Sequence, residues 1–197
     1  LIIRDHLFRL SDKVHLLKAG EVELSTDDAS IRMRNALLYP DRSSPEYPRL
    51  RSSLRVEIPL LELAGVDFQQ ALEKQKIDVG RLNLQAPKVE IFSNRKSSKV
   101  LDLKKFALPL PDFIRTLKIG QLSLSDGKVI TYQSDGAEYL RNGSFNLSCD
   151  VRRLDYGTQR DDFPTVGGST IELTNLLLNL QNGQHQLSVR ALKYDKK

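Results

Sequence analysis

The chain has 197 residues, of which 40% are hydrophobic and 28% charged, and its formal net charge is +5 at pH 7. This composition excludes a disordered chain and suits one globular domain or part of a repeat array. Lysine and arginine are scattered among aspartate and glutamate, which argues against nucleic acid as a partner, and the single cysteine, Cys149, excludes an internal disulfide.

The N-terminal stretch LIIRDHLFRL, residues 1 to 10, lacks an initiator methionine, so we expect the chain to be a segment of a longer protein. No apolar run reaches the roughly 18 residues that a membrane-spanning helix needs, and the layout of a signal peptide is missing. The next residues, SDKVHLL at 11 to 17, are expected to form about one turn of helix.

A strand pattern with a one-residue slip follows in the stretch from 16 to 33. Leu17 and Ala19 alternate with polar residues before Gly20, and Val22 and Leu24 resume the alternation one position late. Because side chains alternate between the two faces of a strand, the slip would turn its second half over. A β-bulge at Gly20 absorbs the extra residue and keeps the apolar side chains on one side.

The same pattern occurs twice more, near 76 to 92 and 116 to 132. Gly80 and Gly120 take the bulge position in these copies, with apolar residues on both sides of each glycine. A polar break of about four residues then precedes a second apolar run, which predicts a hairpin. We therefore predict three bulged hairpins, each introduced by a helical turn, at 11–17, 66–75 and 111–116.

The rest of the chain reads as mostly extended. RLRSSLRVEIPLLEL, residues 49 to 63, is interpreted as an inserted strand in which Pro59 marks an edge, a bend or a break. Asx-Gly pairs at 126–127, 135–136 and 142–143 predict tight turns of a meander, and the pair at 182–183 predicts a fourth hairpin over 169–194 with a slip at Asn175.

These elements predict an all-β, mainly antiparallel fold: a curled sheet of repeated bulged hairpins with a few short helical turns. Residues 1–197 are expected to form one continuous unit, because no stretch has the composition of a linker between domains. Surface loops are predicted at 41–48, 93–98 and 156–168.

No catalytic constellation emerges from the sequence. His6, His15 and His185 lie far apart without the spacing of metal ligands, and the aspartate pairs at 27–28 and 161–162 are typical of turns. We therefore predict no catalytic residue, no metal and no cofactor, and do not expect an enzyme. An enzyme would require these histidines or aspartates to converge in one cleft.

The apolar side of such a sheet has too little helix to cover it. The sheet must close on itself, as in a sandwich, or curl into an open trough that accepts an apolar guest. Each buried methylene contributes about 0.8 kcal/mol, so an acyl chain would gain on the order of ten kcal/mol in such a trough. Alternation alone does not separate a lipid-binding trough from a structural or adhesive β-sandwich with a closed core.

Several phrases of the sequence resemble one family of bacterial envelope proteins. LKIGQLSLSDGKVITY and QKIDVGRLNLQAPKVEIF, with the lead-ins EIPLLELAGVDFQQALEKQ and LPLPDFIRTLKIG, are similar to the AsmA-like proteins of Gram-negative bacteria, especially the large members from the Bacteroidota. CDVRRLDYGTQRDDF and LSVRALKYDKK resemble the same group, so the resemblance covers most of residues 10–197.

This resemblance implies a fold and a function. AsmA-like proteins are similar to the repeating-β-groove lipid-transfer proteins, whose curled sheets form a hydrophobic channel. The chain would be a periplasmic segment that binds or conducts phospholipid, or another acyl-chain lipid, between the inner and outer membranes in outer-membrane biogenesis. An anchor in the inner membrane, the membrane contact and flanking β-repeats would lie outside these residues. The residues expected to line the groove or the core are Val22, Leu24, Ile77, Val79, Leu82, Leu84, Leu117, Ile119, Leu122 and Leu124.

Overall fold

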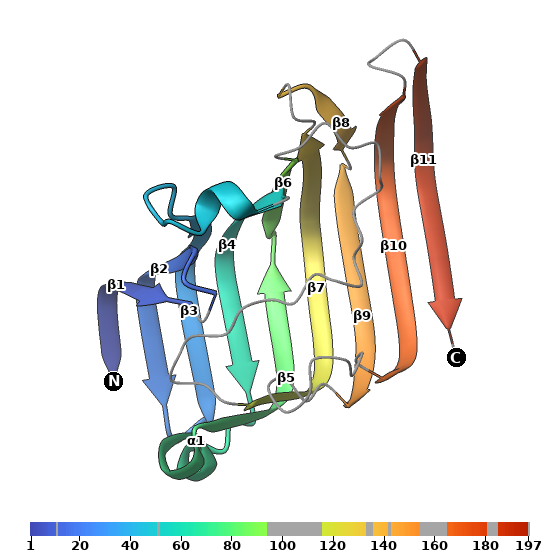
Figure 1. Cartoon of the computed structure of the whole chain (residues 1–197). Coiled ribbons are helices and arrows are strands. Elements are labelled where there is room, and N and C mark those ends of the chain that lie inside the picture. Colours follow the sequence, from blue (N-terminus) through green and yellow to red (C-terminus); the bar gives the residue numbers. More distant parts are fainter. Residues whose placement is uncertain are drawn as a thin grey trace.

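A computed structural model describes residues 1–10, 12–50, 52–93, 116–132, 136–141, 143–153, 165–180 and 185–196. Its strands are β1 (Ile2–Arg9), β2 (His15–Ser25), β3 (Ser30–Pro40), β4 (Ser52–Ala64), β5 (Lys76–Gln85), β6 (Lys88–Ser93), β7 (Thr116–Tyr132), β8 (Glu138–Arg141), β9 (Ser144–Arg153), β10 (Thr165–Leu180) and β11 (His185–Lys196). Two short helices, η1 (Tyr47–Arg49) and α1 (Phe68–Lys74), lie at opposite ends of the strands (Figure 1).

All eleven strands belong to one sheet, in the order β1-β2-β3-β4-β5-β7-β8-β10-β11. β6 continues the line of β5 between β4 and β7, and β9 shares with β8 the line between β7 and β10. Neighbouring strands are antiparallel, except that β5 and β6 run parallel to β7. The predicted all-β, mainly antiparallel class is confirmed, and the described strands form no second sheet of the kind that closes a sandwich.

The prediction that residues 76–92 and 116–132 form hairpins is wrong. β5 and β6 run in the same direction, joined through Ala86 and Pro87, and β7 is one unbroken strand. The two copies lie side by side with a constant offset of 40 residues, from Lys76 opposite Thr116 onwards. The two copies are therefore equivalent, parallel neighbours within one sheet rather than two separate hairpins.

The backbone contacts explain why the polar breaks do not reverse the chain. The N–H of Ala86 donates to Ser125 O, and the N–H of Lys128 donates to Pro87 O, both at 2.8 Å. The neighbouring copy thus satisfies the polar groups of each break, and the break becomes a kink within a continuous strand. A short polar segment with glycine or proline looks the same in the sequence whether the chain turns back or bends.

The first copy does form a hairpin, in which β2 pairs with β3 from His15 opposite Pro40 to Ser25 opposite Ser30. Gly20 is not equivalent to the other two glycines, however, because it faces the positive-φ residue Asn35. Gly80 and Gly120 instead lie next to each other on β5 and β7, where their backbones approach closely.

The remaining predictions have mixed outcomes. The helix expected at 66–75 is present as α1, with Asp67 as its N-cap. The turn of helix expected at 11–17 is absent from its described residues: the Asp12 carboxylate accepts bonds from the N–H groups of Val14 and His15, and β2 starts at His15. Residues 111–115, 135, 142 and 182–183 lie outside the described part.

The predicted turn at 126–127 lies inside β7, and β8 and β9 run in the same direction along one line, so no meander turn separates them. The fourth hairpin is present as β10 and β11, which pair from Ser169 to Leu180, with Asn175 in a positive-φ conformation. The loop at 41–48 consists of turns that lead into η1. The loops at 93–98 and 156–168 fall mostly outside the described residues, and Thr165–Gly168 belong to β10.

A row of irregular backbone crosses the sheet. Asp5, Asn35, Ala86 and Asp126 have φ values of 51°, 54°, 46° and 55°, in a region that costs a residue with a Cβ roughly 1–2 kcal/mol. They occupy matching positions on β1, β3, the β5–β6 junction and β7. We call this row the crease; its members are Asp5, Gly20, Asn35, Pro59, Ala86 and Asp126.

Pro59 shows why the crease suits its sequence. The regular β3–β4 pairs stop at Arg34 opposite Leu60 and resume at Ala36 opposite Ile58, so the ladder is interrupted at Pro59. Proline has no N–H to donate and is tolerated in an interior strand only at such an interruption. Of the edge, bend or break that the sequence predicts at Pro59, the structure shows an interruption of the ladder inside the sheet, and several strands share it.

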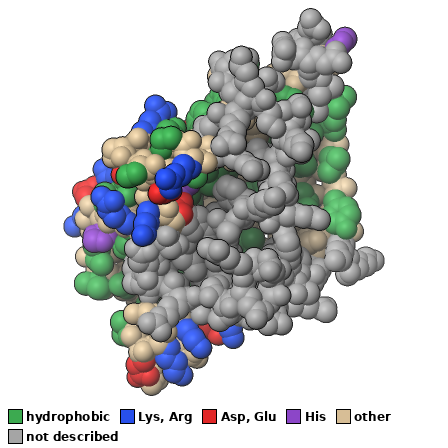
Figure 2. Space-filling model, in the orientation of Figure 1, with side chains coloured by type: hydrophobic (Ala, Val, Ile, Leu, Met, Phe, Trp, Pro, Cys, Tyr) green, Lys and Arg blue, Asp and Glu red, His purple; other side chains and the backbone are tan. Residues whose placement is uncertain are grey.

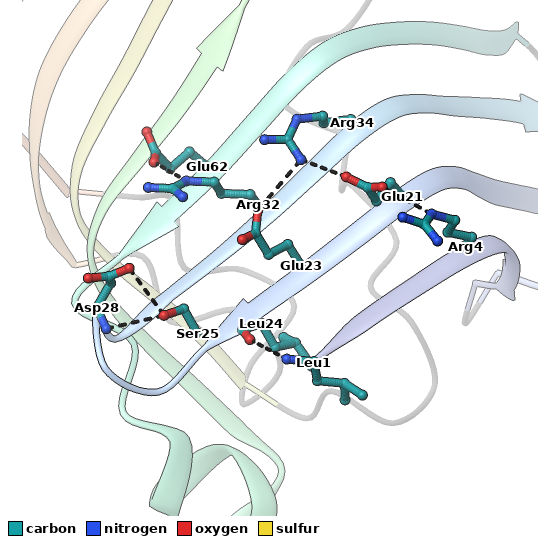
Figure 3. A network of polar contacts seen from close by, with 10 residues as sticks. All are labelled: Leu1, Arg4, Glu21, Glu23, Leu24, Ser25, Asp28, Arg32, Arg34 and Glu62. Carbon is teal, nitrogen blue, oxygen red and sulfur yellow. Dashed lines mark hydrogen bonds and ion pairs between the residues drawn. The ribbon is translucent and has the colours of Figure 1, made fainter.

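The crease moves the alternation of side chains by one residue. On β2, Ala19 is fully buried, whereas Glu21 forms ion pairs with exposed arginines and Val22 is only 6% exposed. In an uninterrupted strand Ala19 would share a face with Glu21, not with Val22. Bulges and kinks of this kind also bend a sheet, and the strands in Figure 3 curve together near Arg4 and Arg34.

Two hydrophobic clusters lie on opposite sides of the crease. The cluster on the η1 side consists of Leu10, Leu38, Leu54 and Val56, with Leu17, Ile58, Val89 and Ile91 packed against it. The cluster on the α1 side consists of Val66, Val79 and Ile119, with Ile31, Leu63, Phe68, Ile77 and Leu82 packed against it. Each half of the sheet thus has its own small core.

Ala86 tests whether the crease stores backbone strain. Ala86→Gly should raise the free energy of unfolding by up to about 1 kcal/mol, because glycine adopts positive φ without the cost of a Cβ. The matched control is Ala191→Gly on exposed β11, where the backbone is extended and glycine should lower stability by roughly 0.5–1 kcal/mol. Urea unfolding measures both, and an equal loss in the two variants would contradict a strained Ala86.

The two adjacent glycines should respond differently to alanine. A Cβ on Gly120 would lie 2.8 Å from Gly80 O, whereas a Cβ on Gly80 would meet Ala64 O at an ordinary 3.5 Å. We expect Gly120→Ala to lower the free energy of unfolding by about 1–3 kcal/mol because the backbones must separate. Gly80→Ala should change it by less than about 1 kcal/mol, and the same loss in both variants would contradict this packing.

Candidate apolar binding face

A row of apolar side chains crosses the whole sheet on the α1 side of the crease. Residues directly opposite each other on paired strands share a face, so each cross-strand pair extends the row by one strand. This first row contains Ile3, Val22, Met33, Leu61, Leu84, Leu124, Leu147, Ile171 and Tyr194. It runs from one edge strand to the other without a charged residue.

A second row runs parallel to the first on the η1 side of the crease. Its members from β1 to β7 are Phe8, Leu17, Leu38, Val56, Val89 and Val129. On β2 these rows pass through Leu17 and Val22, five positions apart, which would place them on opposite faces of a regular strand. Because the crease shifts the alternation by one residue, we assign both rows to one surface, which we call the apolar face.

The dimensions of the apolar face follow from the spacing of strands. The sheet has nine positions from β1 to β11, and strands lie about 4.8 Å apart, so the first row is about 38 Å long. The hydrocarbon region of one membrane leaflet is about 15 Å thick. The first row is therefore longer than one acyl chain lying along it.

Much of this surface is incompletely buried. Leu84 and Leu124 are half-buried, and at the end of the first row Tyr194 is 51% exposed. At the other end of the first row, Ile3 on β1 is 36% exposed.

The residues predicted from the sequence to line a groove fall in two places. Val22, Leu84 and Leu124 belong to the first row. Leu24, Leu82 and Leu122 lie in the next row towards α1, where Leu24 is opposite Ile31 and Leu82 is opposite both Leu63 and Leu122. Ile77, Val79 and Ile119 pack with Val66 and Phe68 beside α1. The backbone of Leu117 pairs with Ile77, and its side chain, like that of Cys149, lies outside the described part.

Sequence reasoning missed the part of the apolar face contributed by β3, β4, β9 and β10. Met33 and Leu61 complete the first row between β2 and β5, and Leu147 and Ile171 extend it beyond β7. Their period-two alternation is visible in the sequence, where it predicts the second arm of the first hairpin, an inserted strand, a strand of a meander and the first arm of the fourth hairpin. Only the pairing of strands distant in sequence assigns them to one row.

The opposite face of the sheet is polar on the α1 side of the crease. One of its rows contains Glu23, Arg32, Glu62, Asn83, Ser123, Ser148, Thr170 and Asp195. Arg32 pairs with Glu62 at 2.9 Å, and Arg34 pairs with Glu21 at 2.6 Å (Figure 3). Hydrogen bonds from Arg34, and then from Arg4, hold the pKa of Glu21 below its usual value, so this face stays charged.

A separate polar cluster surrounds Glu90 on the η1 side. Glu90 is 8% exposed, and its carboxylate pairs with Lys88 Nζ at 2.9 Å and accepts a hydrogen bond from the Tyr132 hydroxyl at 3.3 Å. Burial, and then the charge of Glu90, raises the pKa of Tyr132, whose ring stacks on Phe92 with centroids 4.8 Å apart. These partners satisfy the buried carboxylate, so the cluster has the properties of a structural ion pair.

The histidines and aspartates considered for catalysis do not converge. His6 lies on edge strand β1 and His185 on the opposite edge strand β11, while Asp28 caps the β2–β3 turn through Ser25. His15 contacts Asp12 through Nδ1, and its buried Nε2 has no hydrogen-bond partner among the residues that the structure describes. Asp161 and Asp162 lie outside the described residues, and within the described ranges no three metal-ligating side chains cluster.

Comparison with known proteins gives no assignment: no family model matches the chain, and no curated protein matches it. No helix in the described ranges is both long and apolar enough to cross a membrane.

Asp12 gives the fold a testable dependence on acid. Burial raises the pKa of Asp12, but hydrogen bonds from His15 and Val14 lower it further, so the folded-state pKa lies below the ordinary 3.8. The ionised carboxylate therefore stabilises the fold above about pH 3.8, and this contribution is lost as the pH falls through the lower folded-state value.

We expect Asp12→Asn to be less stable than the unmodified chain at neutral pH and to lose less stability between pH 4 and about pH 2. Asp27→Asn, in the exposed β2–β3 turn, is the matched control. Unfolding midpoints across this pH range measure the effect, and an unchanged acid dependence in Asp12→Asn would show that Asp12 has no such role.

Proposed function

We propose that this chain is a non-enzymatic segment of a periplasmic AsmA-like protein and that it binds or conducts the acyl chains of lipids along the apolar face. The observation that carries the proposal is the first row, which continues uncharged across every position of the sheet. A surface that only fills a core has no need of a row that reaches both edges with members such as Leu84 and Leu124 half-buried and Tyr194 exposed.

The arrangement of the two rows supports an elongated apolar ligand. They run across the strands on either side of the crease, and in our proposal they form the two sides of a shallow trough. Val22, Leu38 and Val56 are themselves buried, so the ligand would contact mainly the half-buried members such as Leu84, Val89 and Leu124. The ion pairs of Arg32 with Glu62 and of Arg34 with Glu21 belong to the opposite face, so an acyl chain in the trough does not desolvate them. Ligand binding would thus bury apolar surface without breaking polar contacts.

The proposal also accounts for the repetition in the sequence. The second and third copies stack in register, so Leu84 lies opposite Leu124 and Val89 opposite Val129. Each further copy would lengthen the trough by one strand, about 4.8 Å, without changing its cross-section. Added repeats make a trough longer, which serves a ligand path that must span a distance, whereas they do not change a local binding pocket.

The test is lipid recovery, followed by titration with a fluorescent fatty acid. Lipids extracted from the purified protein should be detected by mass spectrometry at close to stoichiometric amounts. The double variant Leu84→Gln with Leu124→Gln should weaken binding of the fatty acid about tenfold or more, because two aliphatic contacts with the ligand are lost.

The matched control is Asn83→Gln with Ser123→Gln, the adjacent positions on the polar face. This variant should bind as the unmodified chain does. A lipid-free preparation that does not take up the fatty acid would contradict the proposal, as would equal losses of binding in the two double variants.

A further inference from the structure

A third row of side chains lies on the apolar face beyond the second row, towards η1. It includes Leu10 and His15 at the β1–β2 end, Leu54 and Ile91 on β4 and β6, and Thr131 on β7. Each of these residues lies two positions along the chain from a member of the second row, so their side chains share its face. Leu10 and Leu54 accordingly pack in the cluster on the η1 side.

The third row contains two buried polar atoms that have no partner. Among the described residues, the buried side-chain nitrogen and oxygen atoms without a hydrogen bond are His15 Nε2 and Thr131 Oγ1. Buried polar groups in folded proteins nearly always have a partner. Both exceptions therefore mark places on the apolar face where a polar atom of a ligand would be stabilised.

His15 is the more deeply buried of the two, with 9% of its surface exposed. The Asp12 carboxylate contacts Nδ1 of the ring and also accepts hydrogen bonds from the backbone N–H groups of Val14 and His15. Because the two ring nitrogens lie on opposite sides of an imidazole, Nε2 is directed away from Asp12. Asp12 thus fixes the orientation of the ring and leaves Nε2 as the atom that meets a ligand.

The chemistry of the ring favours an oxyanion as that ligand. With Nδ1–H donated to Asp12, Nε2 carries a proton that it can donate whenever the ring is charged. A carboxylate or phosphate oxygen that accepts this proton forms a charge-assisted hydrogen bond, which is roughly twice as strong as a bond to a neutral hydroxyl.

A pocket of about 450 Å³ at the same end of the strands adds positive charge. Leu10 forms part of its wall, together with Arg9 and Lys13, which are exposed and form no ion pair within the described part of the chain. Its two carboxylates, Asp41 and Glu46, already accept hydrogen bonds from side chains of their own loop and of η1. Figure 2 shows lysine and arginine side chains gathered around the loop that carries η1.

The distance to Thr131 leaves room for an acyl chain. Thr131 lies on β7, four strand positions from His15 on β2, which is about 19 Å at 4.8 Å per strand. The hydrocarbon region of one leaflet is about 15 Å thick. A chain whose polar end is at His15 can therefore lie along the third row without passing Thr131.

We propose that His15 binds the oxyanion of an acyl lipid through Nε2, either the carboxylate of a fatty acid or the phosphate of a phospholipid. Asp12 is the positioning residue, Arg9 and Lys13 supply positive charge beside the site, and the acyl chain lies along the third row. This inference rests on the proposed function, because it requires an acyl lipid on the apolar face, and it adds the chemistry by which the polar end is recognised.

Calorimetric titration with laurate, dodecyl phosphate and dodecanol, which share one chain length, is the first test. At least one of the two oxyanions should bind about tenfold more tightly than dodecanol, and the tighter of the two identifies the source of the oxyanion. Equal affinities for all three ligands would overturn this inference and leave the proposed function intact. Binding of none of them would contradict the proposed function as well.

A substitution assigns the preference to His15. His15→Phe keeps a ring in the row but removes Nε2, so the preference for the oxyanion should disappear while the affinity for dodecanol stays within about twofold. His185→Phe, on the opposite edge strand, is the matched control and should keep the preference. An equal loss of affinity for laurate and dodecanol in His15→Phe would indicate a purely structural role and overturn the inference.

Nitrogen NMR of the unmodified chain, labelled in its three histidines, tests the contact without a substitution that could impair folding. Saturation with laurate or dodecyl phosphate, whichever binds more tightly, should shift the Nε2 resonance of His15 and leave those of His6 and His185 in place. An unchanged His15 resonance in the saturated complex would overturn the proposal.

Discussion

The alternation of side chains along a β-strand is the constraint on which the rest of this structure depends. A strand that is apolar on one face can bend and stay apolar on that face only if its side chains keep to the same sides before and after the bend. Here the apolar residues change phase at the crease: Leu17 and Ala19 precede it on β2, and Val22 and Leu24 follow it. One irregular residue per strand, aligned across the sheet, both bends the sheet and corrects the phase.

Alignment of these irregular residues is what distinguishes a crease from a set of isolated bulges. Asn35, Pro59 and Ala86 each interrupt the ladder at matching positions, so the interruptions coincide instead of being scattered. The positive-φ backbone has an energetic cost at Asp5, Asn35, Ala86 and Asp126. The separate clusters around Leu38 and Val79, one on each side, offset this cost locally and keep both halves of the sheet packed.

Strand content could be predicted from the sequence, but the path of the chain could not. Apolar periodicity is local, and it predicts slips at Gly20, Gly80 and Gly120; the crease contains Gly20 but passes the second and third copies at Ala86 and Asp126. Whether the following polar break reverses the chain depends on which strand satisfies its backbone, and Ala86 and Lys128 find their partners in a copy 40 residues away. For the same reason, the sequence does not predict that Met33 and Leu61 belong to the first row, because their position in it depends on pairing between strands distant in the sequence.

Photocrosslinking on the strand line formed by β5 and β6 tests the central claim most directly. Benzoylphenylalanine would be placed in turn at Leu84 and Val89, on either side of the crease, and at the neighbouring positions Asn83 and Lys88. If the crease keeps both apolar rows on one ligand-binding surface, acyl chains should crosslink at Leu84 and Val89 and not at Asn83 or Lys88. Crosslinking at Leu84 together with Lys88 would show that the alternation passes through the bend uncorrected, and the account would then be wrong.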